Sequence, residues 1–109
     1  MTGALTDTPR IRIGRLEIRP DESTALVDGR PLSLTRRELE VLSLLAARPE
    51  RILPRETIYE AIWGKPLMGG ERSVDVYVSR IRAKLDVALE VEETIHTHPG
   101  IGYRFSYEG

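Results

Sequence analysis

The stretch that decides the fold is RSVDVYVSRIRAKL, residues 72–85. At about 100° per residue, its apolar side chains fall on one side of a helix, while arginine and small side chains gather on the other. The apolar side holds Val74, Val78, Ile81 and Leu85, and the opposite side holds Arg72, Val76, Ser79, Arg80 and Ala83. This pattern predicts a helix with one face packed in a core and the other face exposed.

The exposed face is suited to the major groove of DNA. Arginine pairs bidentately with guanine there, an apolar group can touch the thymine methyl, and small neighbours allow close approach. Asp75 is expected to organise a neighbouring arginine rather than to contact cytosine. The alternative is a plain solvated face, since charged side chains are mostly exposed, and these residues alone leave that alternative open.

Composition limits the possibilities. A chain of 109 residues with 40% hydrophobic and 30% charged residues suits one small globular domain. Cysteine is absent, which excludes disulfides and thiolate metal sites. No apolar run reaches membrane-spanning length, and residues 1–10 lack the pattern of a signal peptide, so we expect a cytoplasmic protein without a membrane partner.

The formal net charge of −1 conceals an asymmetry. Residues 1–71 hold 11 Arg/Lys and 11 Asp/Glu, residues 72–85 hold four and one, and residues 86–109 hold one and five. The segment charges are therefore 0, +3 and −4. The positive charge coincides with the predicted two-faced helix, as DNA binding through that helix requires.

The first third of the chain predicts a small antiparallel sheet. Short alternating runs occupy residues 11–13, 16–18, 25–27 and 31–34, and Asp28-Gly29 is a hairpin turn signal. Residues 1–10 show no periodicity, and we expect a flexible tail or a linker remnant there.

Two helices are predicted next. Thr35 and Glu38 match a capping box that starts a helix over residues 36–47. Pro54 precedes a second helix over residues 55–63, with Ile58, Ala61 and Ile62 inward and Gly64 at its end.

The remaining segments are a loop, a connector and a hairpin. Residues 64–71 are rich in Gly and Pro and are expected to expose Leu67 and Met68. After the third helix, residues 86–93 predict an acidic connector, and residues 94–97 and 103–107 alternate like two strands of a hairpin.

Four motifs, in order and at compatible spacing, resemble the effector domain of the OmpR/PhoB family of bacterial response regulators. They are Leu34-Thr35-x-x-Glu38-x-x-x-Leu42-x-x-Leu45, Arg55-Glu56-x-Ile58 with Ile62-Trp63-Gly64, residues 72–85, and Thr97-x-x-Gly100-x-Gly102-Tyr103-Arg104-Phe105. The resemblance implies one α+β domain over residues 11–107. Its fold would be a winged helix-turn-helix with an N-terminal antiparallel four-stranded sheet, three helices and a C-terminal β-hairpin wing.

The resemblance also implies roles for matching residues. Val76 and Arg80 would face bases in the major groove, Arg82 and Lys84 would lie nearer phosphates, and the wing carries Pro99 where many members have a minor-groove cation. The other positions expected to contact DNA are Arg72, Ser73, Tyr77, Ser79, Trp63, Thr97 and Tyr103. The loop that would meet RNA polymerase contains Lys65, Leu67, Met68 and Glu71.

Catalytic and metal sites are not expected. No Ser/His/Asp arrangement, Gly-rich phosphate loop or carboxylate pair can be assembled from the sequence, so we predict no enzyme and no cofactor. His96 and His98, two apart on a predicted strand, are a possible metal pair, but no third or fourth ligand is evident. We treat them as ordinary hairpin residues.

The resulting hypothesis is sequence-specific binding of double-stranded DNA by a transcriptional regulator, as the output domain of a two-component response regulator. Expected partners are tandem direct repeats of DNA, a second copy of the domain, RNA polymerase and a receiver domain in the parent protein. Two alternatives stay open. One is a winged-helix protein-interaction module that uses residues 86–93 and the Leu67/Met68 loop, and the other is a standalone regulator with no receiver domain.

Overall fold

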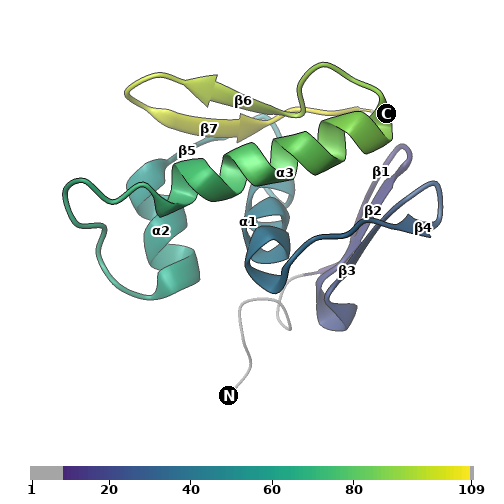
Figure 1. Ribbon diagram of the computed structural model, residues 1–109, viewed down its shortest axis with the longest axis horizontal. Coiled ribbons are helices and arrows are strands. Elements are labelled where there is room, and N and C mark those ends of the chain that lie inside the picture. Colours follow the sequence, from purple (N-terminus) through teal and green to yellow (C-terminus); the bar gives the residue numbers. More distant parts are fainter. Residues whose placement is uncertain (1–8, 109) are drawn as a thin grey trace.

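The computed structural model describes residues 9–108 of the chain, so the tail predicted for residues 1–10 lies almost entirely outside the described residues. The described residues form two sheets and three main helices, arranged as in Figure 1. In chain order the elements are β1 (Ile11–Ile13), β2 (Leu16–Arg19), the short 3-10 helix η1 (Pro20–Glu22), β3 (Thr24–Val27), β4 (Arg30–Pro31), α1 (Arg36–Ala46), β5 (Ile52–Pro54), α2 (Arg55–Trp63), α3 (Ser73–Leu89), β6 (Ile95–His98) and β7 (Gly102–Phe105).

The N-terminal sheet has the predicted antiparallel order β1-β2-β3-β4. Asp28 and Gly29 form its last hairpin turn with φ angles of 55° and 78°, as the type I′ signal predicts. The fourth strand was predicted over residues 31–34 and is shorter, because it covers only Arg30–Pro31. Proline cannot donate a ladder hydrogen bond. One further bond runs from the Leu32 N–H to the Ala25 carbonyl at 2.8 Å, and the chain then leaves the sheet to reach the start of α1.

Helix α1 begins with the predicted capping box. The Thr35 hydroxyl accepts from the Glu38 N–H at 3.2 Å, and the Glu38 carboxylate accepts from the Thr35 N–H at 2.9 Å. Each bond satisfies a backbone donor that a helix start leaves free. The predicted bounds of α1 are confirmed to within one residue.

Helix α2 has the predicted bounds and ends at Gly64, whose φ of 75° is left-handed. The prediction that Ala61 points inward was wrong, since Ala61 is exposed and Tyr59 is buried. The buried side of α2 is centred between Ile58 and Trp63, and at 100° per residue Ala61 lies well away from it.

Helix α3 is longer than predicted, because residues 86–89 continue it instead of forming an acidic connector. Leu89 extends the buried apolar stripe and is 1% exposed. Asp86 is a residue of the last turn of α3, and its carboxylate accepts from the Thr94 N–H at 3.1 Å and from the Thr94 hydroxyl at 2.6 Å. Glu90, with a φ of 58°, ends the helix.

The C-terminal sheet has the order β5-β7-β6. The β6–β7 hairpin was predicted, whereas its third strand, β5, was not. The turn between β6 and β7 is closed by a hydrogen bond of 2.9 Å from the Ile101 N–H to the His98 carbonyl. Pro99 occupies the second position of this turn, and Gly100, with a φ of 75°, supplies the left-handed third position of a type II turn.

The core lies beneath α3. Figure 1 shows α3 crossing the molecule from the loop after α2 to the N-terminal sheet, where Arg15 Nη1 donates to the carbonyl of Leu89 at 2.9 Å. The largest fully buried apolar side chains come from both sheets and all three helices: Leu16, Ile18, Leu42, Leu45, Ile58, Ile81, Leu85, Leu89, Ile95 and Phe105. One core therefore fixes the position of α3 relative to both sheets and to the other two main helices.

We predict that Gly102→Ala destabilises the C-terminal sheet. A Cβ at this position would lie 2.1 Å from the Leu53 carbonyl oxygen and 2.9 Å from the Pro54 Cα, and backbone atoms cannot rotate away. Overpacking of this kind costs about 1 to 3 kcal/mol, which denaturant unfolding measures. Gly69→Ala is the matched control, since nothing lies within 4 Å of its Cβ. Equal stability of the two variants would contradict the close packing of β5 on β7.

Candidate nucleic-acid interface

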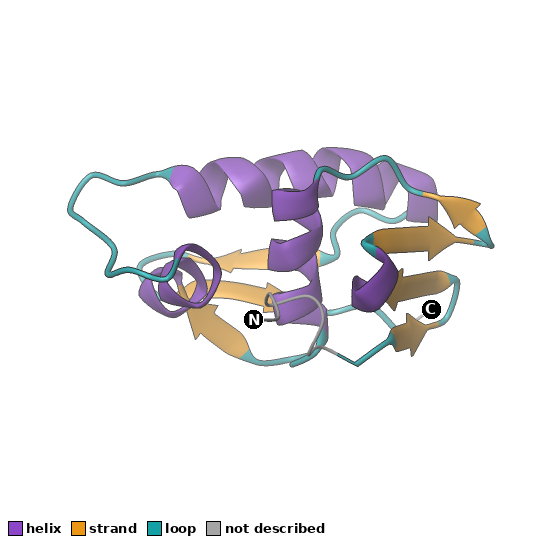
Figure 2. Ribbon diagram, turned by 90° about the horizontal axis from the view of Figure 1, so that it is seen from below, coloured by secondary structure: helices purple, strands orange, loops and turns teal. Residues whose placement is uncertain are grey.

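The outer side of α3 is exposed along its length, as predicted. Figure 2 shows α3 along one edge of the molecule, with the loop after α2 projecting beyond its start. The predicted inward side chains are 0% exposed, and the predicted outward ones are all exposed: Arg72, Val76, Ser79, Arg80 and Ala83. The two-face prediction is confirmed, and the DNA contacts of these residues remain a prediction.

Arg80 is supported by a row of aromatic rings. Its guanidinium lies 5.5 Å from the centroid of Tyr77, and Tyr77 lies 5.7 Å from Trp63 at a tilt of 55°. Trp63 stacks on Tyr59 at 4.8 Å with an interplanar angle of 8°. Cation–π contact restricts the guanidinium without consuming its hydrogen-bond donors. Tyr77 and Trp63 therefore orient Arg80 while leaving it free to pair.

Helix α1 anchors the same row of rings. The Arg37 guanidinium lies 4.9 Å from the Trp63 centroid, and its Nη1 donates to the Ile62 carbonyl and to Glu40, each at 2.9 Å. Trp63, the last residue of α2, therefore contacts a side chain of α1 and a side chain of α3, which gives it a packing role.

Asp75 does organise neighbouring arginines, as expected. Its carboxylate accepts from Arg55 Nε at 3.0 Å and lies 3.5 Å from Arg72 Nε. The Tyr103 hydroxyl also donates to it. Burial by itself raises the pKa of Asp75, but the bonds from Tyr103 and Arg55 outweigh burial and hold the pKa below its ordinary value.

Two of the predicted phosphate contacts have internal partners. Arg82 donates from Nε to the Ile95 carbonyl at 2.7 Å and from Nη2 to the Thr97 hydroxyl at 2.5 Å. Lys84 pairs with Glu38 at 2.7 Å, and the Glu38 side chain is only 2% exposed. Burial alone would raise the pKa of Glu38, but Lys84 and the Thr35 N–H together hold it below its usual value. Both cations therefore fasten α3 to its neighbours, a role that the sequence did not reveal.

The three remaining predicted site residues each form a hydrogen bond within the domain. Ser73, Thr97 and Tyr103 lie near the start of α3 or on the wing, and each has an internal partner: Glu71 for Ser73, Arg82 for Thr97 and Asp75 for Tyr103. Tyr103 is 7% exposed, and burial, followed by Asp75, raises the pKa of its hydroxyl above the ordinary value, so the group remains a donor at neutral pH.

The wing carries Pro99 at its exposed tip, beside His98. His98 Nε2 accepts from Arg104 Nε at 3.1 Å, and Arg104 also pairs with Glu50 at 2.7 Å. His96 Nδ1 lies 2.9 Å from a Glu93 carboxylate oxygen. Within residues 9–108, no group of three His, Asp or Glu side chains is placed to hold a metal ion.

The loop of residues 64–71 is non-helical, as predicted, but its apolar residues differ. Met68 is 70% exposed, whereas Leu67 folds back and packs against the core. The prediction that Leu67 is exposed was therefore wrong. Lys65 is exposed, and the Glu71 carboxylate accepts from the Ser73 hydroxyl.

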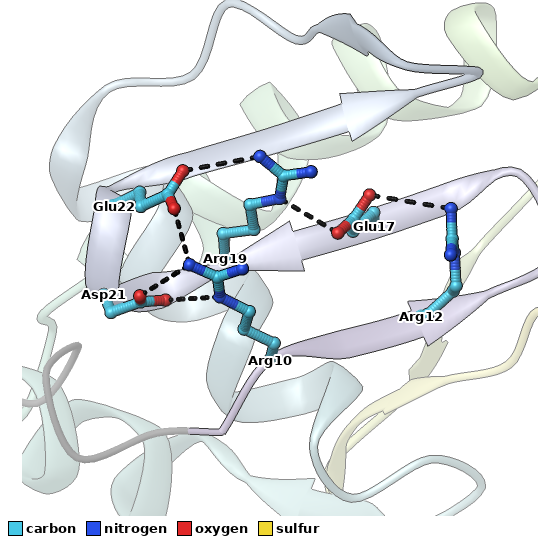
Figure 3. Close-up of polar contacts among 6 residues, drawn as sticks. All are labelled: Arg10, Arg12, Glu17, Arg19, Asp21 and Glu22. Carbon is cyan, nitrogen blue, oxygen red and sulfur yellow. Dashed lines mark hydrogen bonds and ion pairs between the residues drawn. The ribbon is translucent and has the colours of Figure 1, made fainter.

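Three arginines at the first two strands of the N-terminal sheet are neutralised locally: Arg10, Arg12 and Arg19. Figure 3 shows Arg10 between Asp21, at 2.9 Å, and Glu22, at 2.5 Å. Arg19 pairs with Glu17 at 2.9 Å and with Glu22 at 3.4 Å, and Arg12 lies 3.8 Å from Glu17. These cations thus have carboxylate partners, while the Arg80 guanidinium faces solvent over a tyrosine ring.

No helix within the described residues is long and apolar enough to cross a membrane.

Comparison with known proteins gives a consistent result. Residues 29–105 match the model of the family described as "Transcriptional regulatory protein, C terminal". Regulatory protein VanRB of Enterococcus faecalis is 39% identical over 103 residues, which are 94% of this chain and 44% of VanRB. The chain therefore spans less than half the length of this relative.

Solved structures agree with the fold. The DNA-binding domain of CpxR from E. coli superimposes with a TM-score of 0.83 at 28% identity, covering 93% of this chain and 99% of that one. The Klebsiella pneumoniae RstA DNA-binding domain, solved in complex with the RstA box, has a TM-score of 0.80 at 30% identity and covers 89% of this chain and 96% of that one. With two sheets flanking three helices and a C-terminal hairpin wing, the chain belongs to the family of transcriptional regulatory protein C-terminal domains, the OmpR/PhoB-type winged helix-turn-helix effector domains.

Proposed function

We propose that this chain binds double-stranded DNA sequence-specifically as the output domain of a two-component response regulator. The observation that carries the proposal is the outer side of α3, where an oriented arginine stands among small and apolar exposed side chains. An α-helix fits the major groove, which is about 12 Å wide. RstA, a structural neighbour, was solved on its DNA box, which supports the same mode here.

Within this mode, Arg80 pairs with a guanine and Val76 contacts a neighbouring base. Arg72, Ser79 and Tyr77 surround them, and Ser73, Thr97, Tyr103 and Trp63 approach the sugar-phosphate backbone. The internal bonds of Arg82 and Lys84 favour an indirect role for these two, in which they set the tilt of α3. Arg82, whose partners are an uncharged carbonyl and hydroxyl, also contributes long-range positive charge.

The charge distribution supports a modest affinity for each copy. Phosphate contacts dominate DNA affinity, yet the net charge is −1, and Arg10, Arg12 and Arg19 at the N-terminal sheet are paired with carboxylates. Binding of two copies to direct repeats about one helical turn apart would multiply that affinity. We therefore propose tandem sites, with a second copy of the domain as partner.

The proposals for a receiver domain and for RNA polymerase as partners are supported by the family and by the length of its members. VanRB is more than twice as long as the matched region, which supports a receiver domain in the parent protein. Met68 is the exposed apolar residue of the α2–α3 loop and, with Lys65 and Glu71, is the proposed contact for RNA polymerase. The family is one of regulatory domains, which supports a cytoplasmic, non-enzymatic role.

Selection of bound duplexes from a random DNA pool tests the proposal. A recurring motif, spaced as a direct repeat, is the expected result. Absence of enrichment over the input pool would favour the winged-helix protein-interaction module instead. A standalone regulator would give the same motif, and the length of the intact protein distinguishes it.

We predict that Arg80→Ala weakens binding to the selected site by about 1 to 3 kcal/mol and relaxes preference at one base pair. Random duplex should be affected much less, and titrations with both duplexes measure the difference. Equal losses on the two would show that Arg80 contacts phosphate only. Val78→Asp is the contrast, because it places a charge at a position that is 0% exposed, and it should unfold the domain.

We also predict that Pro99→Arg tightens binding where an A/T-rich minor groove lies beside the α3 site. Pro99 is at the second position of a type II turn, which accepts most residues, so the hairpin should persist. The new cation should steepen the slope of log affinity against log salt by about one unit. Pro99→Ala removes the ring without adding charge and serves as control. Identical slopes for both variants would show that the wing stays away from the groove.

A further inference from the structure

One carboxylate collects donors from three elements at the start of α3. Asp75 accepts from Arg55 of α2 at 3.0 Å and from the Tyr103 hydroxyl of β7, and it lies 3.5 Å from Arg72, which precedes α3. The Asp75 side chain is 20% exposed, while those of Arg55 and Arg72 are 45% and 79% exposed. The acid thus lies behind two arginines whose outer sides remain open.

The cluster borders the surface that would face the DNA backbone. A hollow of about 110 Å³ separates the start of α2 from the wing, and its lining includes Arg55, Thr97 and Tyr103. Arg55 and Tyr103 therefore belong both to the hollow and to the Asp75 cluster. A phosphate that entered the hollow would compete with Asp75 for Arg55.

We infer that Asp75 is a specificity-determining residue that acts as an internal counter-ion, withholding Arg55 and Arg72 from the phosphates of non-cognate DNA. The inference rests on the proposed function. At a cognate site, base contacts by α3 bring phosphates close enough to exchange with the carboxylate. At a random site the phosphates are not held in register, and the arginines stay paired with Asp75.

The exchange is physically reasonable because these ion pairs are partly exposed. Such pairs are weak, since water screens them and long side chains lose freedom on pairing. A well-placed phosphate offers arginine the same bidentate geometry as a carboxylate. The Tyr103 hydroxyl remains with Asp75 when the arginines leave, so the carboxylate keeps a hydrogen bond.

The test is Asp75→Asn, which preserves the size of the side chain and an acceptor for Tyr103 while removing the charge. Affinity for random duplex should rise, and its salt slope should steepen by about one unit, so that the gain at 50 mM salt exceeds the gain at 200 mM about threefold to fourfold. The ratio of specific to random affinity should fall. A merely structural Asp75 predicts lower affinity for both duplexes, because α3 would be misplaced, so the rise in random-duplex affinity is the result that distinguishes the two roles.

Glu90→Gln is the matched control for net charge. It removes one negative charge at the far end of α3, where the Glu90 side chain is 79% exposed, and should leave the salt slope unchanged. Arg72→Ala supplies the coupling test. It should cost more affinity for random duplex in the Asp75→Asn background than in the unchanged protein. Equal costs would overturn the inference.

A measurement on the unchanged protein guards against a variant that does not fold. The Nε–H resonance of Arg55 reports its pairing with Asp75, and it should shift on binding the selected duplex but not on binding random duplex. A resonance that neither duplex moves would overturn the counter-ion role while leaving DNA binding intact. If the unchanged protein binds no duplex at all, the proposed function itself fails.

Discussion

The burial of five apolar side chains on one side of α3 determines which side of the helix is exposed. Each of the five is no more than 1% exposed: Val74, Val78, Ile81, Leu85 and Leu89. Burial of apolar surface is the main stabilising force in a domain of this size. It also has a directional consequence for a helix. Once this stripe is inward, the opposite stripe faces solvent, and the exposed arginines have a fixed place.

Polar contacts then fix the rotation and tilt that apolar packing leaves adjustable. Lys84 ties α3 to α1 through Glu38, Arg82 ties it to the backbone of β6, and Asp75 ties it to α2 and β7. Each contact joins α3 to a different neighbour. These contacts hold α3 in one orientation on the domain. A surface held in its binding orientation lowers the cost of association.

Local patterns in the sequence predicted most of the fold. The helical stripe, the Thr35 capping box, the Gly64 helix end and the Asp28-Gly29 turn all depend on neighbours within a few residues. The two largest departures from the predicted fold are strand β5 and the end of α3. Strand β5 is three residues long and is defined by pairing with β7, about 50 positions away. The end of α3 was misplaced because Asp86 and the acidic residues that follow the helix, Glu90, Glu92 and Glu93, resembled a connector, while Leu89 was already part of the core.

The candidate site shows the same limit. Exposure of Arg72, Val76 and Arg80 follows from periodicity and was predicted. The internal partners of Arg82 and Lys84 depend on residues 13 and 46 positions away, and no local pattern contains them. Tyr77 and Arg80 are an i, i+3 pair on a helix, a spacing that brings side chains together. The contact of Tyr77 with Trp63, the last residue of α2, joins two helices.

The central claim is that Arg80 pairs with a guanine edge in the major groove. Replacing single guanines of the selected site by 7-deazaguanine removes the N7 acceptor and leaves Watson–Crick pairing intact. Replacement of one particular guanine per bound copy should lower the affinity of the unchanged protein about tenfold. The same replacement should not change the affinity of Arg80→Ala, because that variant has already lost the contact. If every guanine can be replaced without loss, or if Arg80→Ala suffers the same additional loss, the outer face of α3 does not read the major groove through this residue.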